Sequence, residues 1–167
     1  AVSGRLDSTL YGESVPVHLT EFMFGRGRPP LSGPLDGAGR RSVYQSIRRN
    51  FLPPMMLTFD MPIPFTTFGR RNTTNVPAQS LTLMNDSFVH EQAKVWATSV
   101  QNASDAKPDG ERISALFLQA FSRTPTEAEV ERARNFIDQR RQHYFAQDDT
   151  ENGELLSWID YCHTLFN

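Results

Sequence analysis

The sequence predicts a mainly α-helical protein. We expect an irregular bundle of four to five helices over residues 77–167, after a loop-rich, proline-rich half that carries one or two short strands. Nine of the eleven prolines lie at or before Pro77, and proline interrupts long helices. Beyond Pro77, apolar residues recur every three to four positions, which is the period of an amphipathic helix. Twelve Phe and two Trp within a 38% hydrophobic composition are sufficient for a packed core.

The first half contains few regular elements. Residues 1–40 are predicted to be loop, because Gly, Pro and Ser are frequent there, as in Gly25-Arg26-Gly27-Arg28-Pro29-Pro30. The best strand candidate is the stretch 41–48, where Val43 and Ile47 would share one face.

Helices are expected from residue 52 onward. The stretch 52–59 is predicted to form a short helix with Pro53-Pro54 in its first turn. A second helix is predicted from Pro77 to about Met84, and the residues Asn85-Asp86-Ser87, which cap helices well, interrupt it. The next helix is predicted over 87–102.

Three more helices complete the predicted bundle. The stretch 111–121 has the clearest 3.6-residue period. Its apolar stripe consists of Ile113, Leu116, Phe117, Ala120 and Phe121. Thr126 and Glu129 form a capping-box pattern that starts a helix reaching about Phe145. After an acidic loop, a last helix begins near Glu154.

Charge is unevenly distributed. Residues 1–75 carry nine Arg, no Lys and five acids, for a net charge of +4, whereas residues 76–167 carry a net charge of −6. Such a division suits two lobes that attract each other, or one basic face for an anionic partner. We therefore expect an extended basic lobe, 1–76, and a helical acidic lobe, 77–167. They would form one domain or a fragment of a larger protein, since both ends look like cuts.

Several classes of site are not expected. A single cysteine, Cys162, excludes an internal disulfide, a Cys-based zinc site and covalent haem attachment within this chain. On the last helix it falls on the apolar stripe, where cysteine acts as a small hydrophobe. The four His lack the His-x-x-x-His spacing of a helical metal site. We predict no cofactor and no metal in this chain, no nucleic acid partner at a pI of about 6.1, and no membrane span.

The arginine pairs are the candidate binding feature. Arg40-Arg41, Arg48-Arg49 and Arg70-Arg71 supply fork-shaped donors that bind anions or pin irregular backbone. We expect the second and third pairs to converge on Asp60. One carboxylate cannot satisfy four guanidiniums, so at least two of them must find another partner. The candidate binding residues are Arg41, Tyr44, Arg48, Arg49, Asp60, Arg70 and Arg71.

A family resemblance rests on blocks that occur in order along the chain. They are Ser3-Gly4-Arg5-Leu6-Asp7, Arg40 to Arg49, Phe59-Asp60-Met61-Pro62, Arg70 to Ala93, and Arg123-Thr124-Pro125-Thr126 with Glu129. Together they resemble the C-terminal domain of unknown function of large planctomycete proteins that also carry a cytochrome c-like haem domain. The chain departs from that pattern at Asp86-Ser87, where a small residue and Pro are expected. The resemblance implies a secreted or periplasmic multidomain protein with haem bound elsewhere. It implies no activity and no catalytic residue.

Three functions are compatible with these observations. The first is a non-catalytic module that docks other domains of the parent protein or a separate partner. The second is a module that binds a polyanion or a sulfated or uronic glycan, with sugar faces stacking on Tyr44, Phe51, Phe65 and Phe68. The third is an uncharacterised hydrolase with an Arg/Asp site. Arginines buried against carboxylates would favour the first function, and arginines open onto a groove would favour the second.

Overall fold

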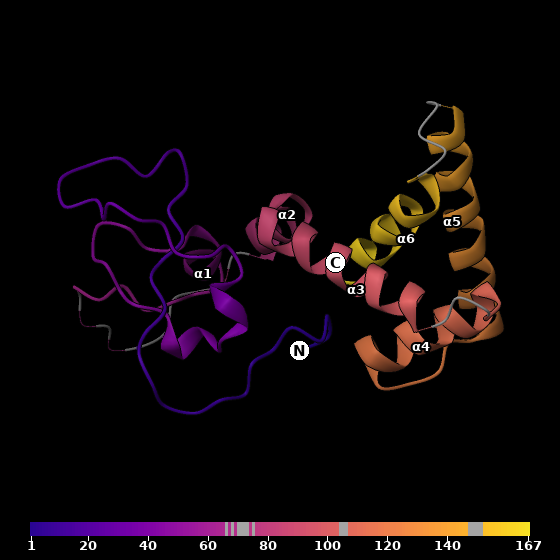
Figure 1. Ribbon diagram of the computed structural model, residues 1–167, viewed down its shortest axis with the longest axis horizontal. Coiled ribbons are helices and arrows are strands. Elements are labelled where there is room, and N and C mark those ends of the chain that lie inside the picture. Colours follow the sequence, from indigo (N-terminus) through magenta and orange to yellow (C-terminus); the bar gives the residue numbers. More distant parts are fainter. Residues whose placement is uncertain (66, 68, 70–73, 75, 104–106, 147–151) are drawn as a thin grey trace. The chain divides into compact units, whose positions relative to one another are not determined.

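The chain forms two compact units. The computed structural model describes residues 1–65, 67, 69, 74, 76–103, 107–146 and 152–167. One unit is Leu6–Phe88, here called the extended unit, and the other joins Ala1–Arg5 to Val89–Asn167, here called the helical unit. The predicted mainly helical fold class is confirmed for the described residues (Figure 1). The predicted boundary between lobes at residue 76 stays a prediction.

Helices dominate the chain from Val76 onward. The α-helices of the described residues are α1 Pro54–Thr58, α2 Val76–Asn85, α3 Ser87–Asn102, α4 Asp109–Phe121, α5 Glu127–Ala146 and α6 Gly153–Thr164. Their bounds lie within about two residues of the predicted ones, because the sequence marks most ends with caps or proline. The predicted acidic loop lies mostly outside the described residues.

The helical unit has one continuous hydrophobic core. Helix α6 lies beside the long helix α5, and α4 also contacts α5 (Figure 1). The two tryptophans, Trp96 and Trp158, are almost fully buried, and each indole N–H has a side-chain acceptor, on Gln119 and Glu154 respectively. The predicted stripe of α4 is buried at Ile113, Leu116 and Phe117 and becomes exposed toward Phe121. Satisfied indoles allow large rings to be buried without the cost of an unpaired donor.

The first five residues belong to the helical unit. The hydroxyl of Ser3 donates a 2.6 Å hydrogen bond to Oε1 of Gln92 on α3, and both side chains are buried. Val2 packs against the same core. No local sequence pattern predicts this contact, because Ser3 and Gln92 are 89 positions apart in the sequence.

The predicted capping box at the start of α5 is confirmed. The backbone N–H of Thr126 donates to Glu129 Oε2 at 2.7 Å, and the Glu129 N–H donates back to the Thr126 hydroxyl at 3.3 Å. Arg123 adds a fork onto the same carboxylate at 2.6 and 2.9 Å. Ser122, the residue before Arg123, ends α4 with a left-handed φ of 54°. The junction therefore satisfies helix-end donors that would otherwise face only water.

The predicted strand at 41–48 is wrong. Ser42–Tyr44 forms a 3₁₀ turn, and Val15 meets Gln45 only through an isolated β-bridge. The side chain of Val43 is 76% exposed, so it has no apolar layer to pack against. The β-like alternation of this stretch is therefore not matched by a neighbouring strand among the described residues, and a strand needs such pairing to persist.

The extended unit has a small core of its own. Val17, Leu19 and Phe51 are buried together, and Met23 packs against them. Gly33 fits tightly here, because a Cβ at this position would lie 1.9 Å from the carbonyl oxygen of Pro16. With so little apolar burial, specific backbone contacts hold much of this unit.

Two contacts organise the end of the extended unit. Gln79 on α2 donates to the carbonyl of Thr58, the last residue of α1, at 3.2 Å. Asp86 follows α2, and its carboxylate accepts the N–H of Phe88 at 2.9 Å. Asp86 therefore caps α3, and the predicted break between two helices is confirmed.

Candidate functional site

The five predicted binding residues that the structure describes belong to the extended unit, and they are Arg41, Tyr44, Arg48, Arg49 and Asp60. Arg70 and Arg71 lie outside the described residues, so their placement stays a prediction. The described candidates fall into two groups, those that hold the unit together and those that face solvent.

Arg40, adjacent to the candidate Arg41, has a structural role. Its Nη2 donates to the carbonyl of Tyr11 at 2.7 Å, and its Nε lies 3.8 Å from a carboxylate oxygen of Asp7. The guanidinium also lies 4.2 Å from the centroid of the Tyr44 ring. The Tyr44 hydroxyl accepts the N–H of Tyr11 at 2.9 Å. Tyr44 therefore joins two loops, and a guanidinium covers one of its faces, so its predicted role as a sugar platform has little support.

Arg41, Arg48 and Arg49 face solvent. All three are exposed, and among the described residues their guanidiniums make no hydrogen bond or ion pair. Three side chains of the same type, from one short segment, thus have no donor bound by the described residues. Open guanidiniums are what a site for carboxylate, sulfate or phosphate groups requires.

Asp60 forms no ion pair with Arg48 or Arg49 among the described residues. Its carboxylate accepts a 2.7 Å hydrogen bond from the hydroxyl of Thr74, and its backbone has a left-handed φ of 62°. Among the described residues, no ion pair links it to Arg48 or Arg49. The expected convergence is therefore absent for this pair, while the part that concerned Arg70 and Arg71 stays a prediction.

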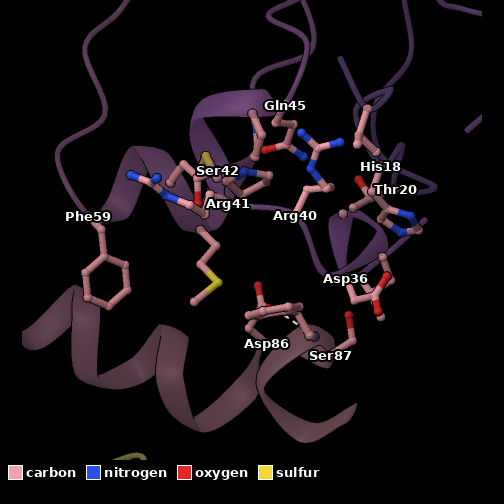
Figure 2. A pocket seen from close by; sticks show the side chains of 18 residues that line it. His18, Thr20, Asp36, Arg40, Arg41, Ser42, Gln45, Phe59, Asp86 and Ser87 are labelled. Carbon is pink, nitrogen blue, oxygen red and sulfur yellow. Dashed lines mark hydrogen bonds between the residues drawn. The ribbon is translucent and has the colours of Figure 1, made fainter. Parts of the chain in front are cut away.

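A cavity of about 340 Å³ opens within the extended unit (Figure 2). Figure 2 shows Arg40, Arg41 and Gln45 on one side and Asp86 with Ser87 on the other. The remaining wall of the cavity is mostly apolar. Its apolar residues are Val15, Leu35, Pro53, Pro54, Met55, Met56, Phe59 and Phe88, and its other residues are His18, Thr20, Asp36, Gly37 and Ser42. This volume lies near the lower limit of small-molecule sites, at about 300 Å³.

Two polar atoms of residues that line the cavity have no hydrogen-bond partner among the described residues. They are the buried Nε of Arg40 and the buried Oε1 of Gln45. An unpaired buried donor or acceptor costs about 1–3 kcal/mol, so a ligand or water that reaches them would be stabilised.

A second, smaller pocket of about 180 Å³ involves Arg48. Its other lining residues are Ser14, Pro16, Val17, Pro29, Leu31 and Ser46. Arg48 is therefore a predicted site residue that borders a concave surface. Its volume is below that of complete small-molecule sites, which begin at about 300 Å³.

The helical unit pairs its central arginines internally. Arg141 donates to Glu154 at 2.6 and 2.7 Å, and to Asp109 and Asp138 at 2.9 Å each. These contacts, above all the hydrogen bonds to Glu154, raise the pKa of Arg141 still further above its ordinary value. Burial of Glu154 acts to raise its pKa, but the hydrogen bonds from Arg141 and Trp158 outweigh burial and lower it.

The predicted aromatic platform needs a correction. Phe51 is buried in the small core and cannot contact a ligand, while Phe68 lies outside the described residues. Phe65 is exposed as predicted. Phe22 and Phe24, which lie within the predicted loop 1–40, are more exposed still, at 88% and 77%. The available sequence signal was a pair of aromatic residues two positions apart in a Gly/Pro-rich segment.

Cys162 lies in the core of the helical unit, as its position on the apolar stripe predicted. It is fully buried, and burial raises the pKa of its thiol to about 12. The described residues contain no cluster of three or more His, Cys, Asp or Glu that could hold a metal ion. His90 on α3 and His163 on α6 place their rings 5.6 Å apart, a proximity that sequence spacing did not reveal.

Throughout the described segments, every helix is too short or too polar to traverse a lipid bilayer. No significant match was found among curated proteins or among solved structures. One family model, described as PSD1, protein of unknown function (DUF1553), matches residues 1–137. This match covers most of the chain, including the extended unit and all three open arginines, and the chain therefore belongs to that family of unknown function.

Proposed function

We propose that this chain is a non-catalytic interaction module of a secreted or periplasmic multidomain protein, and that its extended unit binds anionic groups of a partner. The observation that carries this proposal is the open state of Arg41, Arg48 and Arg49 among the described residues. Exposed guanidiniums without internal partners do not stabilise the fold, so an external partner is the role that their chemistry suits.

The setting of the proposal comes from the family resemblance. In large planctomycete proteins of this kind, a cytochrome c-like domain would bind haem, and this chain would supply an accessory surface. With Cys162 as its single cysteine, the chain lacks the two thiols of a covalent haem site. Other domains of the same parent protein are therefore one class of partner.

An anionic glycan, sulfated or rich in uronic acid, is the second candidate partner. The open arginines favour it, because a guanidinium forms two parallel hydrogen bonds with a carboxylate or sulfate group. A hydrolase with an Arg/Asp site is the weakest candidate. The carboxylate of Asp60 is exposed, and its single hydrogen bond among the described residues comes from Thr74.

The test measures binding to two anionic polymers, poly-L-glutamate and heparin, at about 50 mM and about 200 mM NaCl. We expect the unmodified chain to bind at low salt and to weaken at high salt. The double variant Arg48→Gln/Arg49→Gln should bind about twofold to thirtyfold more weakly, because each exposed ion pair contributes about 0.2–1 kcal/mol.

A matched control separates a specific surface from net charge. Arg132→Gln/Arg134→Gln removes the same two charges from exposed positions on α5 in the helical unit. We expect that variant to bind like the unmodified chain. Equal losses in both double variants would mean that only net charge matters, and unchanged binding in Arg48→Gln/Arg49→Gln would refute the anion-binding proposal.

A further inference from the structure

The extended unit presents two aromatic rings to solvent on one loop. Phe22 is 88% exposed and Phe24 is 77% exposed. Single exposed apolar side chains are common on protein surfaces, but neighbouring large ones mark a contact surface more often. Leu31, further along the same Gly/Pro-rich stretch, is also largely exposed.

Contacts within the loop hold these rings outward. Met23, between the two Phe, packs against the buried core residues Val17, Leu19 and Phe51. Arg28 donates a hydrogen bond from Nη1 to the carbonyl of Met23, and its guanidinium lies 5.6 Å from the centroid of the Phe24 ring. The loop is therefore anchored on both sides of Phe24. An anchored ring loses less conformational entropy on binding than a mobile one.

The loop lies next to the segment that carries the open arginines. Asn50 donates from Nδ2 to the carbonyl of Arg26 at 3.4 Å, and Phe51 shares the small core with Met23. Arg48 and Leu31 line the same pocket of about 180 Å³. Two contacts and one shared pocket thus join the two segments. The exposed aromatic and arginine residues of these two segments are called here the aromatic–arginine surface, and they are Phe22, Phe24, Arg26, Arg28, Arg48 and Arg49.

We propose that the aromatic–arginine surface binds an acidic carbohydrate chain, with sugar faces on Phe22 and Phe24 and carboxylate or sulfate groups on Arg48 and Arg49. This inference rests on the proposed anion-binding function. Aromatic rings offer flat apolar faces, and guanidiniums offer paired donors, so the combination matches a ligand that alternates rings with anionic groups. The pocket beside Arg48 is too small for a complete ligand and suits one substituent of a longer chain.

A lipid surface fits these observations less well. Insertion of Phe24 into hydrocarbon would carry along the guanidinium of Arg28, which is bound to the loop through the Met23 carbonyl. Removing a charged group from water costs several kcal/mol, so this arrangement opposes deep insertion. A carbohydrate chain binds at the surface and leaves the guanidinium hydrated.

The experiment compares three polymers that separate rings from charges. Oligogalacturonate carries both rings and carboxylates, poly-L-glutamate carries carboxylates without rings, and methyl-esterified galacturonan carries rings without charge. Phe22→Ala/Phe24→Ala should bind oligogalacturonate about tenfold more weakly, with an unchanged dependence on salt concentration. Its binding to poly-L-glutamate should not change. Phe22→Tyr/Phe24→Tyr should retain the binding to oligogalacturonate.

Tyr11→Ala is the matched control, because Tyr11 is an exposed ring of the same unit on a loop that contacts Arg40 and Tyr44. It should bind like the unmodified chain. Unchanged oligogalacturonate binding in Phe22→Ala/Phe24→Ala would overturn the carbohydrate inference while leaving anion binding intact. Equal losses on oligogalacturonate and poly-L-glutamate would overturn it too, as would Phe-dependent binding to phosphatidylglycerol vesicles alone. If the unmodified chain binds no anionic polymer, the proposed function itself fails.

Discussion

The two units differ in the contacts of several of their arginines. In the helical unit, Arg123, Arg140 and Arg141 each form hydrogen bonds with at least one carboxylate of the same unit. In the extended unit, Arg48 and Arg49 make no such contact among the described residues. The helical unit also buries a large core, whereas the core of the extended unit is small.

This difference indicates a division of roles. Paired arginines between helices fix the positions of elements that already pack well, and their removal leaves carboxylates close to one another. Open arginines in a loop-rich unit contribute little to stability, because water satisfies their donors. The helical unit thus has the properties of a scaffold, and the extended unit has those of a binding surface.

The largest expected effect is in the helical core. Leu116→Ala should lower the free energy of unfolding by about 2–5 kcal/mol, because Leu116 is fully buried and its loss leaves a cavity. Leu118→Ala, on the same helix but 57% exposed, should cost less than about 0.5 kcal/mol. Chemical denaturation of both variants measures the difference, and similar midpoints would contradict the assignment of α4's buried face.

Loss of the Arg141 network should have the next largest effect. Arg141→Met keeps an apolar stem but leaves Glu154, Asp109 and Asp138 without their shared partner. We expect a loss of about 1.5–3 kcal/mol, the range for hydrogen bonds to charged groups. Arg132→Met, at an exposed position of the same helix, is the control and should be nearly neutral. If the two variants melt alike, the network does not stabilise the scaffold.

The capping box at the start of α5 should contribute less. Thr126→Ala removes the acceptor for the Glu129 N–H and should cost about 1 kcal/mol. Thr126→Ser retains that acceptor and should restore most of the stability. A melting temperature that stays within error for the alanine variant would argue against the cap.

The same junction predicts a pH dependence. Hydrogen bonds from Arg123 and from the Thr126 backbone lower the pKa of Glu129 from its ordinary value near 4.5 to about 2. The stabilisation is therefore complete above about pH 4.5 and is lost as the pH falls toward about 2. The melting temperature of the unmodified chain should decline more steeply over this range than that of Glu129→Gln. Parallel curves would show that Glu129 does not titrate with an altered pKa.

The smallest effect on stability should come from the open arginines. Arg48→Gln/Arg49→Gln should change the free energy of unfolding by less than about 0.5 kcal/mol, because neither guanidinium has a described partner. Thermal denaturation tests this directly. A large destabilisation would erase the contrast between the two units and favour a structural role for this pair.

Most of the helical unit was predictable from local patterns. The period of apolar residues located its helices, and the Thr126–Glu129 pattern identified the start of α5. The absence of a strand at 41–48 could not be predicted in this way. Alternation in the sequence shows which side chains a strand could bury, but it does not show whether a second strand is present to pair with it. The attachment of Ser3 to Gln92 was equally hidden, since it joins segments far apart in the chain.

In the candidate site, the sequence determined the type of residue, and the tertiary structure determined the contacts of each one. Composition and spacing determined that the first half of the chain is basic, rich in loops and marked by arginine pairs. Tertiary structure decided that Arg40 binds Tyr11 and Asp7 while its neighbour Arg41 has no described partner. Adjacent residues of one type share the same local sequence, so only contacts with distant segments distinguish them. Those contacts depend on how loops close over a small core, and no local propensity encodes that closure.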